Sequence, residues 1–198
     1  RAVYPAHPYG RTLLGAKKDV SSLSKKSVIQ HYLRYYRPNN SILSVVGKFD
    51  EAYARKVEAT FANWTRRDVP TSDIPVPVET AGIRLRVVDK PGLTQAQIRF
   101  AGLGIERKDE SFLALRVANT ILGGAFTSRL NDKVRKELGL TYGISSSFDP
   151  RLQRGPFEIE TFTKVDSIKQ VVDETLAIYR SFIEKGVTSE EVDRAKGY

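Results

Sequence analysis

Apolar residues along this chain recur with two different spacings, which predict a mixture of helices and strands. A spacing of three or four positions, typical of an amphipathic helix, occurs in 25–37, 50–64, 110–122, 126–138 and 167–185. Alternating or short apolar runs, typical of strands, occur in 42–46, 83–87, 95–100, 141–148 and 157–163. The last two runs are joined by a loop with Pro150 and Gly155-Pro156, so they predict a β-hairpin.

Several helix ends carry local signals that support these boundaries. Ser24 or Ser27 can cap the first helix, and Pro38 ends it. Asp50 is a predicted N-cap of the second helix. Gly186 ends the helix over 167–185. Thr188 with Glu191 three residues later then fits a capping box that opens a final helix.

The helix over 126–138 has a single apolar face. The face consists of residues four positions apart, namely Phe126, Leu130, Val134 and Leu138. Arg135 lies about 100° around the helix from Val134, at the edge of that face.

Arg135 and Tyr142 flank the point where this helix stops and a strand opens. Gly139 is the predicted stop, and the strand begins at Thr141. Both side-chain tips could therefore meet at one corner, where a guanidinium and a phenol are donors suited to a peptide carbonyl. The alternative is that Arg135 is a solvated helix charge and Tyr142 a half-buried strand residue. On chemistry alone this alternative is the stronger of the two.

Composition excludes some chemistry and leaves other partners open. The 198 residues include no Cys, so neither a disulfide nor a thiolate metal site can form. The net charge is +9, but basic residues come in pairs rather than long runs, which is typical of a solvated surface. Nucleic-acid binding is weakly indicated, and attraction of acidic peptides is equally compatible. No apolar run approaches the length of a membrane span.

The two histidines do not have the spacing of a metal site. His7 precedes Pro8 in a loop, and His31 lies in mid-helix with no acidic residue nearby in sequence. We therefore predict no metal ligand and no catalytic residue in this chain.

A set of short motifs nevertheless resembles the M16 zinc peptidases, the family of pitrilysin, insulin-degrading enzyme and the mitochondrial processing peptidase. The second-domain signature of that family is similar to 122–130 followed by 135–142. Other matching pieces, in the family's order, are His7-Pro8-Tyr9-Gly10, Tyr36-Arg37-Pro38-Asn39-Asn40, Val45-Val46-Gly47, Asp89-Lys90-Pro91-Gly92, Thr94-Gln95-Ala96-Gln97-Ile98 and Gly104-Ile105. The resemblance spans essentially the whole chain and points to a bacterial protein.

The resemblance implies an α+β fold, with an antiparallel sheet flanked by helices, in two similar domains that close around an extended peptide. Residues 1–67 would be the tail of the first domain, 68–81 a linker, and 82–198 a C-terminally truncated second domain. The family's zinc is held by an inverted His-x-x-Glu-His motif and a distant Glu in the first domain. Zinc is therefore expected in the parent protein or a partner subunit, with no cofactor in this chain. Arg135 and Tyr142 match the family pair that binds substrate near the scissile bond.

Three functions and one structural hypothesis follow from the sequence. The first function is the substrate-gripping part of an M16-type endopeptidase, and the second is a non-catalytic subunit of a heteromeric peptidase or complex. A nucleic-acid-binding module is a distant third, so we expect a peptide substrate and a homo- or hetero-oligomer, with no nucleic acid and no membrane span. The compartment is left open, with a bacterial periplasm or envelope favoured. We also hypothesise that the leading segment completes the truncated sheet, within the chain or by exchange with a neighbour, because 42–46 would otherwise be an open edge.

Overall fold

The structure is a computed structural model that describes residues 2–198 and divides into two compact units. The smaller unit is Arg11–Asp73. The larger unit is Ile74–Tyr198 together with the N-terminal segment that ends at Gly10.

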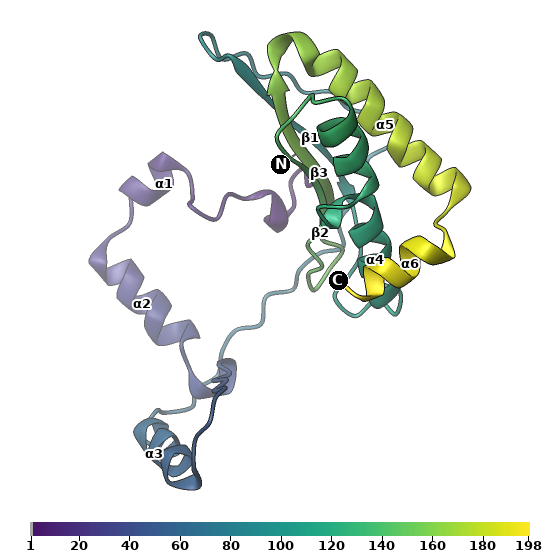
Figure 1. The fold of residues 1–198 in the computed structure, drawn as a ribbon. Coiled ribbons are helices and arrows are strands. Elements are labelled where there is room, and N and C mark those ends of the chain that lie inside the picture. Colours follow the sequence, from purple (N-terminus) through teal and green to yellow (C-terminus); the bar gives the residue numbers. More distant parts are fainter. Residues whose placement is uncertain (1) are drawn as a thin grey trace. The chain divides into compact units, whose positions relative to one another are not determined.

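The smaller unit contains α1 (Lys17–Ser21), α2 (Lys25–Tyr35) and α3 (Glu51–Phe61), shown in purple to blue in Figure 1. The predicted helices α2 and α3 are confirmed, and so are their caps. The Ser24 hydroxyl accepts a hydrogen bond from the Ser27 N–H, and the Asp50 carboxylate accepts one from the Tyr53 N–H at 2.8 Å. These ends are correctly predicted because a cap depends only on residues within one turn.

Two predicted strands are wrong. Residues 42–46 and 83–87 form no β-structure among the described residues, and their apolar side chains are exposed, with Ile42 at 97% and Ile83 at 93%. A strand needs a neighbour to accept its hydrogen bonds, and an alternating pattern does not supply one. Because 42–46 and the sheet belong to different units, completion of the sheet by 42–46 within the chain stays a hypothesis. Exchange with a second chain remains a hypothesis.

The larger unit is built on a three-stranded antiparallel sheet of order β1-β3-β2. The strands are β1 (Gln95–Leu103), β2 (Ile144–Phe148) and β3 (Pro156–Lys164), and β2 with β3 confirms the predicted hairpin. Buried Thr161 is opposite both Ile98 of β1 and Ile144 of β2, so these three residues lie in one row across the sheet. The α+β fold class with an antiparallel sheet is thus confirmed.

Helices cover one face of this sheet (Figure 1). They are α4 (Phe112–Asn119), the π-helical segments η3 (Thr120–Gly124) and η4 (Asn131–Glu137), α5 (Ile168–Lys185) and α6 (Ser189–Lys196). The hydrophobic core lies between the helices and the sheet and is formed by Leu122, Leu130, Val134, Ile144, Ile159 and Val171. Of the predicted apolar face over 126–138, Leu130 and Val134 are fully buried, but Phe126 is 56% exposed and precedes the helix.

Close approach between a helix and a strand explains the Gly123-Gly124 pair. A Cβ atom at Gly123 would lie 2.6 Å from the Ser146 Oγ and 2.7 Å from the Ser146 N. Only glycine therefore lets η3 lie this close to β2. Asn119 uses the same proximity, since its side-chain amide donates to the Ser146 carbonyl at 2.9 Å and its carbonyl accepts from the Ser146 hydroxyl at 2.8 Å.

No helix within residues 2–198 combines the length and the apolar character that crossing a membrane requires.

Candidate functional site

The corner between η4 and β2 is held in place by a tight turn at Gly139–Gly143. Gly139 has φ of +61°, a left-handed conformation that ends the helix as predicted. The chain then turns back, and the Thr163 hydroxyl donates to the Leu140 carbonyl at 2.6 Å. The Thr141 hydroxyl, which is buried, accepts from the Gly143 N–H at 3.1 Å. The regular strand therefore opens at Ile144, three residues later than predicted.

The turn brings Arg135 and Tyr142 together. The Arg135 Nε donates a hydrogen bond to the main-chain carbonyl of Tyr142 at 2.9 Å, while the Tyr142 side chain is 84% exposed. The two residues therefore share one corner, although no contact joins their side-chain tips. Their link is a side-chain to backbone hydrogen bond, which leaves the phenol free to contact a ligand.

Phe126 forms the other support of the Arg135 guanidinium. The guanidinium carbon lies 4.2 Å from the centroid of the Phe126 ring, and the Lys136 ammonium lies 5.5 Å from it. The ring and the Tyr142 carbonyl restrain the guanidinium from two sides. No residue in 2–198 accepts a hydrogen bond from the two terminal nitrogens of Arg135, so these donors remain available.

A groove of about 600 Å³ opens beside this corner. It is lined by Gln95, Arg135, Lys136, Gly139, Leu140, Thr141, Tyr142, Phe162, Thr163, Lys164 and Ser167. The residues come from the end of η4, the turn, the first residue of β1, the last residues of β3 and Ser167, which directly precedes α5. A groove this size holds a few residues of an extended peptide.

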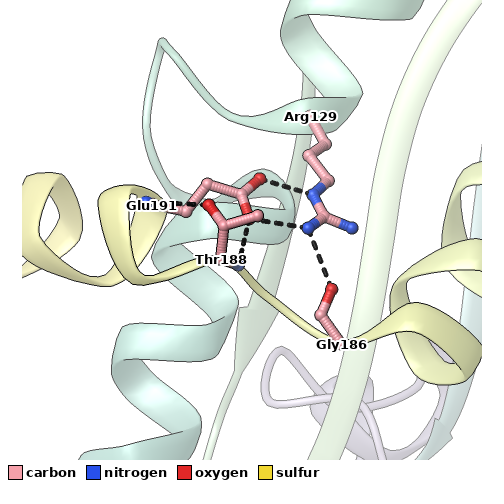
Figure 2. A network of polar contacts seen from close by, with 4 residues as sticks. All are labelled: Arg129, Gly186, Thr188 and Glu191. Carbon is pink, nitrogen blue, oxygen red and sulfur yellow. Dashed lines mark hydrogen bonds and ion pairs between the residues drawn. The ribbon is translucent and has the colours of Figure 1, made fainter.

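A second polar cluster anchors the loop that carries Phe126. Arg129 makes a bidentate ion pair with Glu191, in which its Nε and a terminal nitrogen each lie 2.7 Å from a carboxylate oxygen (Figure 2). The same terminal nitrogen donates to the Gly186 carbonyl at 2.9 Å. Thr188 completes the predicted capping box, since its N–H donates to the Glu191 carboxylate at 2.8 Å.

Electrostatics show that this pair is a strong one. The hydrogen bonds from Arg129 are the largest cause that lowers the pKa of Glu191 to about 2. The same pairing raises the pKa of Arg129. Because the carboxylate is stabilised in its charged form, α6 is tied to the start of the helix that contains Arg135.

The residues present do not fit a zinc site. Within 2–198 no group of three or more His, Asp or Glu side chains is arranged to hold a metal ion. Both ring nitrogens of His7 contact the chain itself. Its Nε2 lies 2.7 Å from the Pro75 carbonyl, and its Nδ1 lies 3.1 Å from the Tyr9 N–H. His31 lies within α2.

Arg135 and Tyr142, which the sequence singled out, lie together at this corner, and their role in substrate binding stays a prediction. Phe126 and Lys164, which the structure places beside them, were not singled out as site residues. Phe126 was assigned to the apolar helix face because it continues the four-residue spacing. The signal against that assignment was Gly123-Gly124, since a glycine pair two residues before Phe126 favours a loop there. Lys164 carried no local signal, because it reaches the groove only through the pairing of β3 with β1.

Comparisons with known proteins give a consistent result. The profile of the family described as "Peptidase M16 inactive domain" matches residues 22–197. The uncharacterized zinc protease YmxG of Bacillus subtilis is 27% identical over 99% of this chain and 47% of its own length. The chain therefore spans about half the length of the curated relatives it matches.

Solved structures share the fold over nearly the whole chain. The peptidase M16 inactive domain from Pseudomonas fluorescens is 27% identical, with a TM-score of 0.85 over 98% of this chain and 47% of its own. A chain of complex III2 from Candida albicans is 17% identical, with a TM-score of 0.79 over 99% of this chain and 48% of its own. At that identity the second likeness concerns the fold alone.

Proposed function

The chain belongs to the M16 peptidase family, in which it matches the inactive-type domain, and from that premise we propose that it supplies the peptide-gripping surface of a zinc-dependent endopeptidase. In this proposal Arg135 and Tyr142 bind the substrate backbone near the scissile bond. Residues 2–198 supply no metal ligand in this proposal.

The observation that carries the proposal is the way the Arg135 guanidinium is held. Its Nε is bound to the Tyr142 carbonyl and its face lies on Phe126, so the direction of the two terminal nitrogens is restrained. Within residues 2–198 these nitrogens have no hydrogen-bond partner. Donors fixed before the substrate arrives lose little entropy on binding and can stabilise an oxygen that becomes negative during peptide hydrolysis. The Tyr142 hydroxyl is a second donor at the same groove.

In this proposal zinc binds outside this chain. Relatives of twice this length are named zinc proteases, and no residue cluster described here fits the metal. We therefore assign the metal-binding residues to the remainder of the parent polypeptide or to a partner subunit. Bound there, zinc would supply the activated water for hydrolysis. This chain would orient the peptide.

A non-catalytic scaffold subunit is the second candidate function. The fold likeness to a chain of complex III2 favours it, because the similar domain there is part of a large assembly. An inverted His-x-x-Glu-His motif in the polypeptide that precedes Arg1 would favour the peptidase. A protein that lacks this motif, and whose partner subunit also lacks it, would favour the scaffold.

The proposal is tested by turnover of the complete protease, or of the heteromer to which the chain contributes. We expect Arg135→Ala, and separately Tyr142→Phe, to lower kcat roughly 100-fold, as loss of one preorganised donor does in other acyl-transfer enzymes. Arg180→Ala is the matched control, because Arg180 is exposed on α5 and does not line the groove. Unchanged turnover in both groove variants would contradict the proposal.

A further inference from the structure

The groove beside Arg135 has an unusual charge balance. Three of its lining residues are cationic, namely Arg135, Lys136 and Lys164, and none is Asp or Glu. Most of a protein surface mixes both signs of charge. A groove lined by positive charges alone favours ligands that carry a negative charge.

Only one of the three cations is neutralised by a neighbouring carboxylate. The Lys136 ammonium lies 2.5 Å from an Asp132 oxygen. Arg135 is held by a carbonyl and an aromatic ring, neither of which carries a formal charge. Lys164 is exposed and has no ion-pair partner within residues 2–198. Two positive charges in the groove are therefore uncompensated.

The backbone adds to the same potential. Helix α5 has 18 residues and begins directly after Ser167, which lines the groove and makes no side-chain cap. The N-terminal end of a helix carries a partial positive charge that favours an anion within the first turn. Asp166 is the nearest carboxylate in sequence, but it is exposed and does not line the groove.

We infer that this groove selects peptides with an acidic residue next to the segment that Arg135 and Tyr142 bind. Lys164 would contact the acidic side chain and Arg135 the peptide backbone. The inference rests on the proposed function and adds the chemical class of the substrate. The net charge of +9 acts in the same direction, since it draws an acidic peptide towards the surface before contact.

The test uses the full chain and three fluorescent peptides that differ at one position, occupied by Glu, Gln or Lys. Affinities are measured by fluorescence anisotropy at low salt. The three-peptide comparison is repeated with the variable residue at each successive position of the peptide, to find the position that lies beside Lys164. At one position we expect the Glu peptide to bind roughly threefold more tightly than the Gln peptide, the size of an exposed ion pair. The Lys peptide should bind most weakly.

Lys164→Glu should invert this order, so that the Lys peptide binds most tightly. Lys185→Glu is the charge-matched control, because Lys185 lies at the far end of α5, roughly 25 Å along the helix. The control should keep the order of the unmodified chain. An order that responds equally to both variants would show a general charge effect and would overturn the inference.

The remaining outcomes separate this inference from the proposed function. Equal affinity for all three peptides, with binding lost in Arg135→Ala, overturns the acidic preference alone. Two results overturn both the acidic preference and the proposed function. One is binding that survives Arg135→Ala, and the other is no binding of any peptide at millimolar concentration. A short DNA duplex that competes as well as the Glu peptide, and loses affinity to the same extent in Lys164→Glu, would assign the groove to nucleic acid instead.

Discussion

Phe126 shows how a single residue can be misread from its spacing and still be part of the site. Its four-residue interval to Leu130 places it on an apolar helix face, yet the ring lies on the surface beneath the Arg135 guanidinium. The difference arises because the chain leaves the helix at Gly124 and re-enters it only at Arg129. Its contact with Arg135 makes Phe126 a positioning residue for the proposed donor.

Replacing Phe126 with Ala should therefore lower turnover without unfolding the protein. We expect kcat of the complete protease to fall roughly fivefold, since an exposed cation–π contact contributes about 0.5–1 kcal/mol. The melting temperature should change little, because the ring is already more than half exposed. Phe126→Trp should keep kcat near the value of the unmodified protease, whereas Phe126→Leu, which is apolar but not aromatic, should lower kcat as Phe126→Ala does. Equal activity of the Trp and Leu variants would contradict a cation–π role.

The helices and the sheet differ in how well the sequence predicts them. The starts of α2, α3, α5 and α6 were predicted closely, since caps such as Ser24 and Thr188 act within one turn. Residues 42–46 and 83–87 were wrongly predicted to be strands, because strand pairing depends on distant residues. The same distinction applies to the site. Arg135 and Tyr142 are close in sequence and could be found, whereas Lys164 needed the sheet register.

The Arg129–Glu191 ion pair should make the docking of α6 depend on pH. The folded-state pKa of Glu191 is about 2, below the value of about 4.3 expected in the unfolded chain. A depressed carboxylate pKa stabilises the fold fully above the unfolded pKa and loses that contribution as pH falls towards 2. Glu191→Gln should thus lower the free energy of unfolding by about 2 kcal/mol at pH 7.

Denaturant unfolding at pH 7 and at pH 3 measures this prediction. The difference between the unmodified chain and Glu191→Gln should be smaller at pH 3 than at pH 7. Glu137→Gln is the control, because Glu137 pairs with Lys133 on an exposed helix surface and should contribute little. A difference that stays constant between the two pH values would contradict the assignment.

At the scale of the whole molecule, the exposed apolar residues of 42–46 and 83–87 need partners. Ile42, Val46, Ile83 and Leu85 are each at least 88% exposed. We propose that these segments pair with another part of the protein or with a second copy, and that 1–67 and 82–198 belong to two domains joined by 68–81. Exposed apolar segments with a strand-like sequence pattern favour such association.

The chain should therefore self-associate in solution. Sedimentation velocity over a range of micromolar concentrations should show dimers or larger species, and Ile42→Lys with Val46→Lys should reduce them. Leu13→Lys is the control, because Leu13 is equally exposed but lies outside both segments. A chain that stays monomeric throughout this concentration range would contradict pairing with a second copy.

The smaller unit offers a competing place for a peptide. It contains an apolar groove of about 410 Å³, whose lining includes Leu43, Phe49, Phe61 and Trp64. A peptide held mainly by apolar contacts would bind there, whereas a peptide held by backbone hydrogen bonds would bind beside Arg135.

Photo-crosslinking of a benzoylphenylalanine-containing peptide to the full chain distinguishes these two grooves most directly. The site of attachment is read by mass spectrometry after proteolysis. The account predicts attachment within 135–142 or 162–167, and its loss in Arg135→Ala. Attachment within 43–64 that persists in Arg135→Ala would contradict the claim that this domain grips peptides at the corner between η4 and β2.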